Sequence, residues 1–348
     1  MKIAIVTDAW KPQVNGVITT LVNTGECLTA DGHDVHFITP QDFIRTPCPT
    51  YPEIRLSLFP GRKVARTLDE LQPDRIHVAT EGPLGLAARK YCIKRKLFFT
   101  TSYHTRFPQY VQARFPIPLS WSYGYMRWFH SAAEHTMVGT ETQRDDLLKN
   151  DFQNVVLWPR GVDTDAFYPS EDKSFLTDAR PIQMYVGRVA VEKSLEDFLR
   201  LDTPGTKYVV GDGPALKQLR RDFPDAVYTG YRFGEELTRY LAAADVFVFP
   251  SRTDTLGLVL LEAMACAVPV AAYPVMGPID VVDHGLTGIL DEDLAKAIEG
   301  ALALNPDDCR EAALRRSWQA ASRQFYANLV DASPPSGRIE TQSEQTTT

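Results

Sequence analysis

Short apolar runs alternate along the chain with longer stretches in which apolar residues recur at helical spacing. The runs are rich in Val, Ile, Phe and Thr, as β-strands are. They are KIAIVTD, DVHFITP, RIHVAT, KLFFTTS and HTMVGT in the first half, and IQMYVG, KYVVGDG, AVYTGY, DVFVFP and PVAAYP in the second. This alternation is typical of βαβ units around a parallel sheet. We therefore predict an α/β protein with two doubly wound, Rossmann-like domains.

The pattern stops at GVDTDAFYPSEDKSF and then starts again, which divides the chain in two. Ligands of open α/β sheets bind outside the carboxyl ends of the strands. If the two domains face each other, the ligand lies in an interdomain cleft. The predicted parts are a first domain, 1–166, a linker, 167–180, a second domain, 181–318, a closing helix, 319–331, and a polar tail, 332–348, expected to be disordered.

The composition is that of a soluble globular protein, because 44% of the 348 residues are hydrophobic and 23% are charged. The apolar runs are far shorter than the ~20 residues that cross a bilayer, and since a strand is predicted at the very start, no signal peptide is expected. Five scattered cysteines without metal-ligand spacing indicate a cytoplasmic chain with reduced thiols. The net charge of -7 argues against a nucleic-acid partner.

One region differs in charge from the rest of the chain, because no Asp or Glu occurs between Glu81 and Glu134. It holds eight Lys and Arg and 12 of the chain's 36 aromatic residues. Basic side chains attract anionic headgroups, and Trp and Tyr favour the membrane interface, so we predict a peripheral membrane surface. A helix pair with core aromatics and solvated basic residues is the alternative. The residues predicted to face the membrane or acceptor are Arg106, Phe107, Tyr110, Arg114, Trp121, Tyr125, Arg127 and Trp128.

The first strand is followed by TDAWKPQVNGV, which has a single glycine, Gly16, where a dinucleotide-binding fold has G-x-G-x-x-G. NAD binding is therefore disfavoured. A glycine ahead of a helix that begins at Val17 still lets an anion approach the helix N-terminus closely. An ordinary turn glycine is the alternative.

The second domain carries charged residues after two of its strands. Arg188 and Lys193 follow IQMYVG, and a fork-shaped cation beside a point charge suits a diphosphate. In SRTDTLGLVLLE, a helix predicted to start near Leu258 offers free amides to an anion. Asp254 and Glu262 should lie ~10 Å apart, which is too far for the carboxylate pair of a retaining hydrolase, where ~5 Å is usual.

That separation matches the span from the sugar to the ribose of a nucleotide-sugar, with the diphosphate between them. The alternative makes Asp254 a helix cap and Glu262 a surface acid. An acid on such an apolar helix nevertheless needs a polar partner, and ribose hydroxyls provide one. The amides predicted to hold the phosphates belong to Thr255, Leu256, Gly257 and Leu258.

Together these residues resemble a known family, the retaining glycosyltransferases of family four, whose fold of two facing Rossmann-like domains is called GT-B. The resemblance spans residues 1 to about 330, and it rests on KPQVNGV, SYHTRFPQY, GVDTDAF, GR followed by EK, VVGDGP and SRTDTLGLVLLEAMACAVPV. It implies that Arg188 and Lys193 bind the donor diphosphate, that Glu262 holds the ribose, and that His104 lies beside the anomeric carbon.

The resemblance also implies that Asp254 contacts sugar hydroxyls, although the family usually has Glu there and the reach of Asp is one methylene shorter. Gly211 and Tyr231 are predicted to contact the base. The leaving diphosphate is thought to help deprotonate the acceptor on the same face, while cations and amides stabilise the charge that builds on it. Neither a metal nor another cofactor is expected, and the literal Asp-x-Asp at Asp163 and Asp165 is predicted to cap the chain.

The segment SYHTRFPQYVQARFPIPLSW is similar to members of the family that act on lipids, including sulfoquinovosyldiacylglycerol synthases and related mannosyltransferases. We therefore predict transfer of glucose or glucuronic acid from a UDP-sugar to diacylglycerol, by a peripheral enzyme on the cytoplasmic, anionic face of the membrane. The alternative is a GDP-mannose-dependent α-mannosyltransferase with a lipid acceptor. Outside this class, a nucleotide-sugar epimerase, a non-catalytic nucleotide-binding module and a phosphorylase that uses pyridoxal phosphate remain open.

Overall fold

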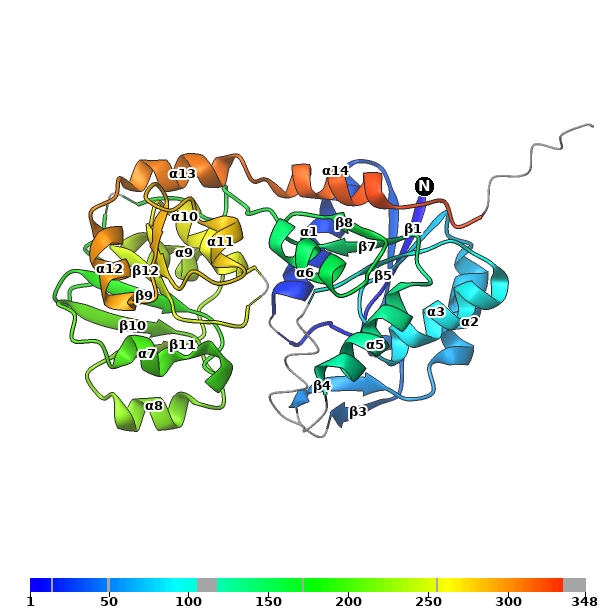
Figure 1. The fold of residues 1–348 in the computed structure, drawn as a ribbon, viewed down its shortest axis with the longest axis horizontal. Helices are drawn as coiled ribbons and strands as arrows, with labels where there is room; N and C mark the ends of the chain where they lie inside the picture. The colour runs from blue at the N-terminus through cyan, green and yellow to red at the C-terminus, as the bar shows by residue number, and fades with distance from the viewer. Residues whose placement is uncertain (14, 49–50, 105–117, 171, 255, 334–348) are drawn as a thin grey trace, which may run out of the picture.

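The computed structural model describes residues 1–13, 15–48, 51–104, 118–170, 172–254 and 256–333. Two parallel sheets of six strands each form the framework, and helices cover both faces of each sheet (Figure 1). The predicted α/β fold of two doubly wound halves is therefore confirmed. The strands were foreseeable because the central ones are buried on both sides, and burial on both faces gives the short continuous apolar runs of the sequence.

The first sheet has the strand order β2-β1-β5-β6-β7-β8. Its strands are β1 (Lys2–Val6), β2 (Asp34–Ile38), β5 (Arg75–Val78), β6 (Thr100–Ser102), β7 (His135–Val138) and β8 (Val155–Leu157). The helices around it are α1 (Gly16–Ala30), α2 (Gly61–Leu71), α3 (Pro83–Arg95), α5 (Leu119–His130) and α6 (Glu141–Lys149), with a short 3-10 turn, η1 (Pro40–Asp42). A separate antiparallel hairpin consists of β3 (Arg45–Cys48) and β4 (Tyr51–Ser57).

The second sheet has the order β11-β10-β9-β12-β13-β14. Its strands are β9 (Ile182–Val186), β10 (Thr206–Val210), β11 (Val227–Gly230), β12 (Val246–Phe249), β13 (Val270–Ala272) and β14 (Gly288–Leu290). The helices are η2 (Val191–Lys193), α7 (Leu195–Leu199), α8 (Leu216–Asp222), α9 (Gly234–Ala243), α10 (Leu258–Ala265), α11 (Pro278–Val281), α12 (Leu294–Leu302) and α13 (Pro306–Leu314). The order reverses between β9 and β12, and such a switch point is where doubly wound sheets bind ligands.

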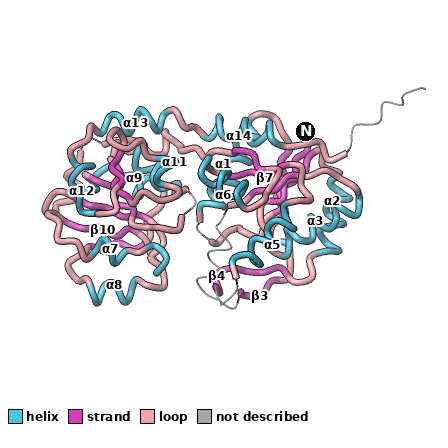
Figure 2. Tube along the Cα trace, viewed as in Figure 1, coloured by secondary structure: helices cyan, strands magenta, loops and turns pink. Residues whose placement is uncertain are grey.

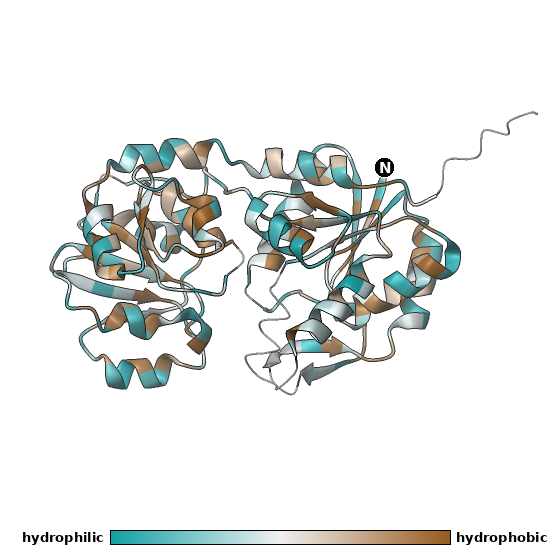
Figure 3. Ribbon diagram, in the orientation of Figure 1, coloured by the Kyte–Doolittle hydropathy of each residue, from teal (hydrophilic) through white to brown (hydrophobic). Residues whose placement is uncertain are grey.

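Each sheet separates two apolar layers. In the second half, α9, α10 and α13 bury one face of the strands and α7 and α12 bury the other. Figure 3 shows that the helices carry both hydrophobic and hydrophilic residues, as helices packed on a sheet do. Within the described chain, no helix combines the length and the apolar character that a membrane crossing needs.

The last helix, α14 (Trp318–Asn328), belongs spatially to the first half, because it packs against α1 (Figure 1). Phe325 is fully buried there, beside Trp158. Ala332, the predicted first residue of the tail, is buried and exchanges backbone hydrogen bonds with Asp74 and Phe98. The packed chain thus runs past the predicted start of the tail, whereas residues 334–348 lie outside the described part. The remaining domain boundaries stay predictions.

The two halves lie side by side (Figure 2), and loops of one approach loops of the other between them. A Cβ built on Gly16, at the start of α1, would lie 3.5 Å from Leu258 at the start of α10. A Cβ on Gly139, directly after β7, would lie 3.7 Å from the side chain of Leu256. The amide of Thr142 in α6 also donates a 3.1 Å hydrogen bond to Asp280 in α11. The loop after β12 therefore touches the first half of the chain.

Candidate functional site

The loops that follow β9 and β12 meet at the switch point of the second sheet. Lys193 Nζ lies 2.5 Å from Asp254 Oδ1, and both side chains are largely buried. Thr253 donates to the carbonyl of Glu192, which holds the two loops together. The strands β9 and β12 are neighbours, so residues far apart in sequence come together here. The structure thus unites one cation and one acid of the predicted donor site.

Tyr185 connects Arg188 to the same cluster of charged residues. The Tyr185 hydroxyl donates to the carbonyl of Arg188 at 2.9 Å. Burial raises the pKa of Tyr185 well above its usual value; the charges of Asp254 and Glu192 raise it further, and the charge of Arg188 opposes them. These charges therefore surround one buried ring. Arg188 itself pairs with Glu192.

Glu192 is a site residue that the sequence reasoning missed. It lies inside the quoted stretch YVGRVAVEKS, between the two predicted cations. The available signal was its position four residues after Arg188, which is the spacing of an ion pair in a helix. It was missed because this segment was interpreted only for its two cations. In this structure both cations face carboxylates, so a bound diphosphate would replace acids as their partner.

The two carboxylate oxygens of Asp254 differ in their hydrogen bonds. Its Oδ1 binds Lys193, whereas its Oδ2 is buried and has no hydrogen-bond partner in the described part of the chain. A buried carboxylate oxygen left without a donor is costly, and a hydroxyl group would satisfy it. The geometry of Asp254 is therefore that of an acceptor for a ligand hydroxyl rather than that of a helix cap.

The helix α10 begins at Leu258, as predicted, and Gly257 precedes it with φ +81°. This left-handed conformation favours glycine and lets the chain turn sharply from β12 into the helix. The first turn of a helix presents backbone amides without intrahelical acceptors, so Leu256, Gly257 and Leu258 lie where an anion would bind. Thr255, also predicted to contribute, lies outside the described residues.

Glu262 lies one turn inside α10 and remains partly accessible between the buried Leu261 and Ala263. Within the described residues its carboxylate makes neither a hydrogen bond nor an ion pair. Burial raises the pKa of Glu262 to about 7. A carboxyl group with a raised pKa and no partner marks a candidate binding position.

Two further predicted donor contacts lie at the ends of β10 and β11. A Cβ on Gly211 would fall 1.9 Å from the carbonyl oxygen of Gly187, so only glycine fits this crossing. Tyr231 is partly exposed and stacks with Phe233, which gives the end of β11 an aromatic surface. Stacking on such rings is one way in which proteins hold bases.

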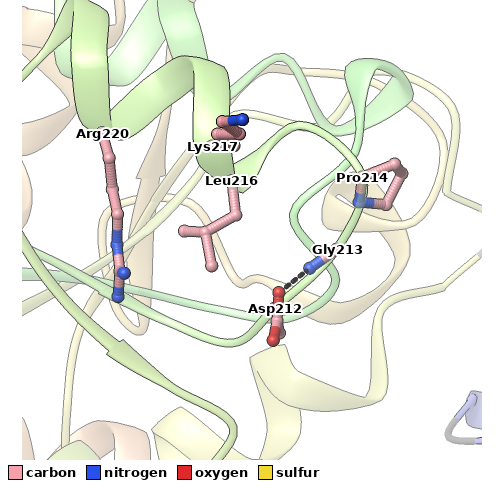
Figure 4. Close-up of a pocket in the computed structure, with 6 residues that line it drawn as sticks. All are labelled: Asp212, Gly213, Pro214, Leu216, Lys217 and Arg220. Carbon is pink, nitrogen blue, oxygen red and sulfur yellow. Dashed lines mark hydrogen bonds between the residues drawn. The ribbon is translucent and has the colours of Figure 1, made fainter.

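A pocket of about 320 Å³ lies beside Gly211, in the loop from β10 into α8 (Figure 4). Asp212 accepts a 2.6 Å hydrogen bond from the amide of Gly213, and both residues line the pocket. The residues lining it are Asp212, Gly213, Pro214, Leu216, Lys217 and Arg220. None of the four charged residues predicted to hold the donor lines this pocket, so we regard it as a neighbour of the site.

His104 follows β6 in the first half and is held by Arg160, which follows β8. Arg160 Nη2 lies 3.3 Å from His104 Nδ1. Burial and the charge of Arg160 lower the pKa of His104 well below its usual value. A Cβ built on Gly139 would lie 3.7 Å from Arg160 Nη2 and also 3.7 Å from the side chain of Leu256. Arg160 and His104 therefore lie close to the loop that follows β12.

Arg160 was also missed from the sequence. It directly precedes the GVDTDAF motif, where a basic residue in an apolar context, LWPRGV, was the available signal. The Asp-x-Asp in that motif behaves as predicted at its first position. Asp163 Oδ1 accepts hydrogen bonds from the amides of Asp165 and Ala166 at 3.0 and 2.9 Å, which is a capping role.

The predicted membrane residues divide into three groups. Trp121 and Trp128 project from α5 with 73% and 51% of their surface exposed. Tyr125 and Arg127 lie partly buried on the same helix, where they donate to the carbonyls of Glu81 and Asn150. Arg106, Phe107, Tyr110 and Arg114 lie outside the described residues. The alternative, in which the aromatics are core residues, holds for four buried rings but not for the two tryptophans; the buried rings are Phe99, Tyr103, Tyr123 and Phe129.

Two six-stranded parallel α/β sheets, with charged residues at the switch point of the second, have the architecture of the GT-B glycosyltransferases. Family models agree with this class. "Glycosyltransferase Family 4" matches residues 14–166 and "Glycosyl transferases group 1" matches residues 180–304. The chain belongs to the family-four glycosyltransferases, which are retaining hexosyltransferases.

Named relatives include GDP-mannose-dependent α-mannosyltransferases. The protein from Corynebacterium glutamicum is 29% identical and covers 97% of this chain and 91% of its own length. The one from Mycobacterium tuberculosis is 30% identical over 83% of each chain. An α-monoglucosyldiacylglycerol synthase from Acholeplasma laidlawii is 29% identical over 95% of this chain and 98% of its own.

Among solved structures, sucrose-phosphate synthase from Thermosynechococcus elongatus superimposes with a TM-score of 0.74 at 23% identity. The match covers 94% of this chain and 97% of that one. It establishes the GT-B fold. The roles of individual site residues stay predictions.

Proposed function

We propose that this protein is a GDP-mannose-dependent α-mannosyltransferase that acts on a lipid acceptor at a membrane surface. The observation that carries the proposal is the similarity to GDP-mannose-dependent mannosyltransferases along nearly the whole chain. It favours the alternative given above over the UDP-glucose or UDP-glucuronic acid donor that the sequence interpretation placed first. The donor remains a nucleotide-sugar in either case.

The charges at the switch point support a division of labour along the donor. Asp254 Oδ2 is a buried acceptor for a sugar hydroxyl, and Glu262 is an unpartnered acceptor for ribose within the described chain. Between them, Arg188, Lys193 and the first turn of α10 would hold the diphosphate. As the bond from the anomeric carbon to the diphosphate breaks, these donors stabilise the charge on the leaving oxygen.

The acceptor hydroxyl attacks the same face of the sugar, and its proton passes to the leaving diphosphate. The new glycosidic bond thus keeps the configuration of the donor. His104, on the opposite wall, would orient the sugar rather than take the proton, because its low pKa keeps it a neutral imidazole and a weak base. The two cations take over the charge stabilisation that a divalent metal provides in other glycosyltransferases.

A second candidate is glucosyl transfer to diacylglycerol. It is favoured by the similarity to the Acholeplasma laidlawii synthase, which extends over almost the whole of both chains. Both candidates share the lipid acceptor, so they differ in the base and the sugar of the donor.

Exposed apolar rings on the first half support a lipid acceptor at a membrane. Trp121 and Trp128 lie seven residues apart on α5, which places them on one side of that helix. Phe59 and Ile44, at the base of the hairpin, are 95% and 79% exposed. Phe59 also has φ +47°, a strained conformation for a bulky residue. An exposed and strained ring is unfavourable for the isolated chain, so we infer that Phe59 has an external partner.

The charge around Phe59 indicates which partner. Residues 43–68 contain five Lys and Arg against one acid. Arg62, Lys63 and Arg66 in the first turns of α2 are exposed. Exposed apolar rings within a basic surface fit an anionic bilayer.

The test is incubation of the purified protein with radiolabelled GDP-mannose, UDP-glucose and UDP-glucuronic acid in anionic vesicles that contain diacylglycerol or a bacterial lipid extract. We expect labelled lipid from GDP-mannose, and no loss of activity in a chelator. Lipid product from UDP-glucose alone would establish the second candidate instead. Conversion of a donor without any acceptor would identify an epimerase, and abolition by EDTA with rescue by magnesium would contradict the metal-free mechanism.

A further inference from the structure

Arg160 is a buried cation without a carboxylate partner in the described part of the chain. It is 8% exposed, and its guanidinium lies 4.2 Å from the centre of the Trp158 ring. Its Nη1 donates to the carbonyls of Trp158 and Pro159. Burial lowers the pKa of Arg160 to about 9, so it is still charged at neutral pH. Retaining a buried charge is costly, and such a charge commonly serves a site.

The contact between Arg160 and His104 has only one chemical interpretation. A guanidinium has N–H donors and no acceptor, so His104 Nδ1 must be the acceptor across the 3.3 Å between them. A histidine that accepts at Nδ1 is neutral and carries its proton on Nε2. Protonation at Nδ1 would remove the hydrogen bond and bring two positive charges together.

We propose that Arg160 is a positioning residue that fixes His104 as the neutral Nε2–H tautomer, so that His104 presents a hydrogen-bond donor to the sugar of the bound nucleotide-sugar. The proposal rests on the proposed role of His104 beside the anomeric carbon. It assigns Arg160 a function in catalysis that acts through His104.

The other groups around His104 reinforce its neutral state. His77 and His130, like Arg160, lower the pKa of His104. An acid on this side, Glu81, is bonded to His130 at 3.2 Å. The Trp158 ring packs edge-on against His104, with 5.6 Å between the ring centres. Among the described residues, the groups named here, an aromatic ring, two imidazoles and a guanidinium, do not favour an imidazolium at His104.

The backbone around Arg160 is held on both sides. Trp158 is fully buried, and a Cβ on Gly161 would lie 2.4 Å from the amide of Trp318. Val162 pairs with Ser317, where the chain returns from the second half to the first. Arg160 therefore cannot shift far, and His104 is preorganised before any donor binds.

The tautomer is measured directly by NMR with 15N-labelled histidine, with His104→Asn used to assign the signal. In the unmodified protein we expect the Nε2–H pattern for His104 at every pH from 5.5 to 8. An Nδ1–H pattern, or protonation of His104 above pH 6, overturns the proposal. This measurement needs no substrate, so it is independent of whether the donor is GDP-mannose or a UDP-sugar.

The functional test uses Arg160→Gln, Arg160→Lys and, as a matched control, Arg144→Gln on the surface of α6. In Arg160→Gln we expect the pKa of His104 to rise towards 6.5, kcat to fall about tenfold at pH 7.5, and a new acid limb to appear in the pH profile. Arg160→Lys, which still donates and remains charged, should recover part of kcat. A wild-type pH profile in a folded Arg160→Gln protein sinks the idea. If Arg160→Gln does not fold, Arg160→Lys and the tautomer pattern still decide the question.

Discussion

Glu262 meets two opposing requirements. In its proposed role it accepts hydrogen bonds from the ribose of the nucleotide-sugar, yet it lies in an apolar helix that disfavours its charge. The outcome is a pKa of about 7, so near neutral pH the empty site holds this group in a mixture of protonated and ionised forms. Hydroxyls of a bound ribose donate to the ionised form and would draw the mixture towards it.

Donor affinity should therefore depend on pH through Glu262. Ligand binding favours the carboxylate, so a proton is released on binding below about pH 7, and affinity falls as the pH falls further, by up to tenfold per unit. Isothermal titration of intact GDP-mannose from pH 5.5 to 8 measures this, because its diphosphate diester does not itself titrate there. Glu262→Gln should bind more weakly at pH 8 and lose this dependence. A flat profile in the unmodified protein would exclude the proposed contact.

The same pKa shift predicts a stability effect of opposite sign. The folded-state pKa of Glu262 lies above the usual value near 4.5, so the ionised carboxyl disfavours the folded state as the pH rises from 4.5 to 7. Glu262→Gln should then raise the free energy of unfolding of the ligand-free protein by about 1–3 kcal/mol at pH 8, with little effect at pH 4.5. Urea unfolding at both pH values measures it. Lower stability at pH 8 would show that Glu262 has a partner.

At the scale of elements, α5 and the base of the hairpin expose large apolar side chains, which most protein surfaces bury. Arg89 of α3 stacks on Trp128, with 4.0 Å to the ring centre, and donates to the carbonyls of Trp128 and Phe129. Arg89 therefore fixes the orientation of the exposed Trp128 ring. An exposed ring in a fixed orientation suits an interface that is flat, as a bilayer is.

Membrane binding should therefore depend on these exposed rings. Vesicle flotation of Trp121→Ser with Trp128→Ser, and of Phe59→Ser alone, should each lower the bound fraction on anionic vesicles several-fold, and high salt should lower it further. Leu314→Ser, an equally apolar exposed position in the second half, serves as the control. Unchanged flotation of both variants would show that the rings serve another partner, and size-exclusion chromatography would then identify a second copy.

Elements were predictable from the sequence where apolar periodicity was long enough to detect. Leu258 was correctly placed at the start of α10, because a strand, a glycine and an apolar helix follow one another there. The strands β8 and β14, VVL and GIL, were missed because they are edge strands that are only partly buried, whereas the equally short β6 and β13 are fully buried. The β3 and β4 hairpin was missed because its sequence lacks a clean alternation.

The site was predictable in its residue types and less so in its contacts. Lys193 and Asp254 were both singled out, but each was assigned to the donor and not to the other. Their pairing depends on β9 and β12 being neighbours, and a strand order that skips two strands has no local signal. The role of Arg160 was hidden for the same reason, since His104 follows a different strand.

At the scale of the molecule, α14 couples the end of the chain to the wall that carries His104. Phe325 packs between His77 and Trp158, with ring centres 4.8 and 4.5 Å away, and Trp158 in turn supports Arg160. Among the described residues, no ring of the second half stacks on Phe325 in this way. A substitution at Phe325 should therefore lower kcat, which depends on His104, more than it lowers the affinity of the second half for the nucleotide.

Phe325→Ala opens a cavity in a fully buried aromatic cluster and should lower the free energy of unfolding by about 3–5 kcal/mol. Because Trp158 can then relax, kcat should fall further than it does in the control Leu148→Ala, an exposed position on α6 whose change should stay within about 0.5 kcal/mol. Binding of GDP to the second half should keep its affinity within about threefold, since a cavity far from the nucleotide changes its binding free energy little. Thermal unfolding, steady-state kinetics and titration of GDP measure the three quantities. A decrease of GDP affinity as large as the decrease of kcat would mean that α14 acts on both sheets together, through the crossing at Val162 and Ser317, and not through the wall that carries His104 alone.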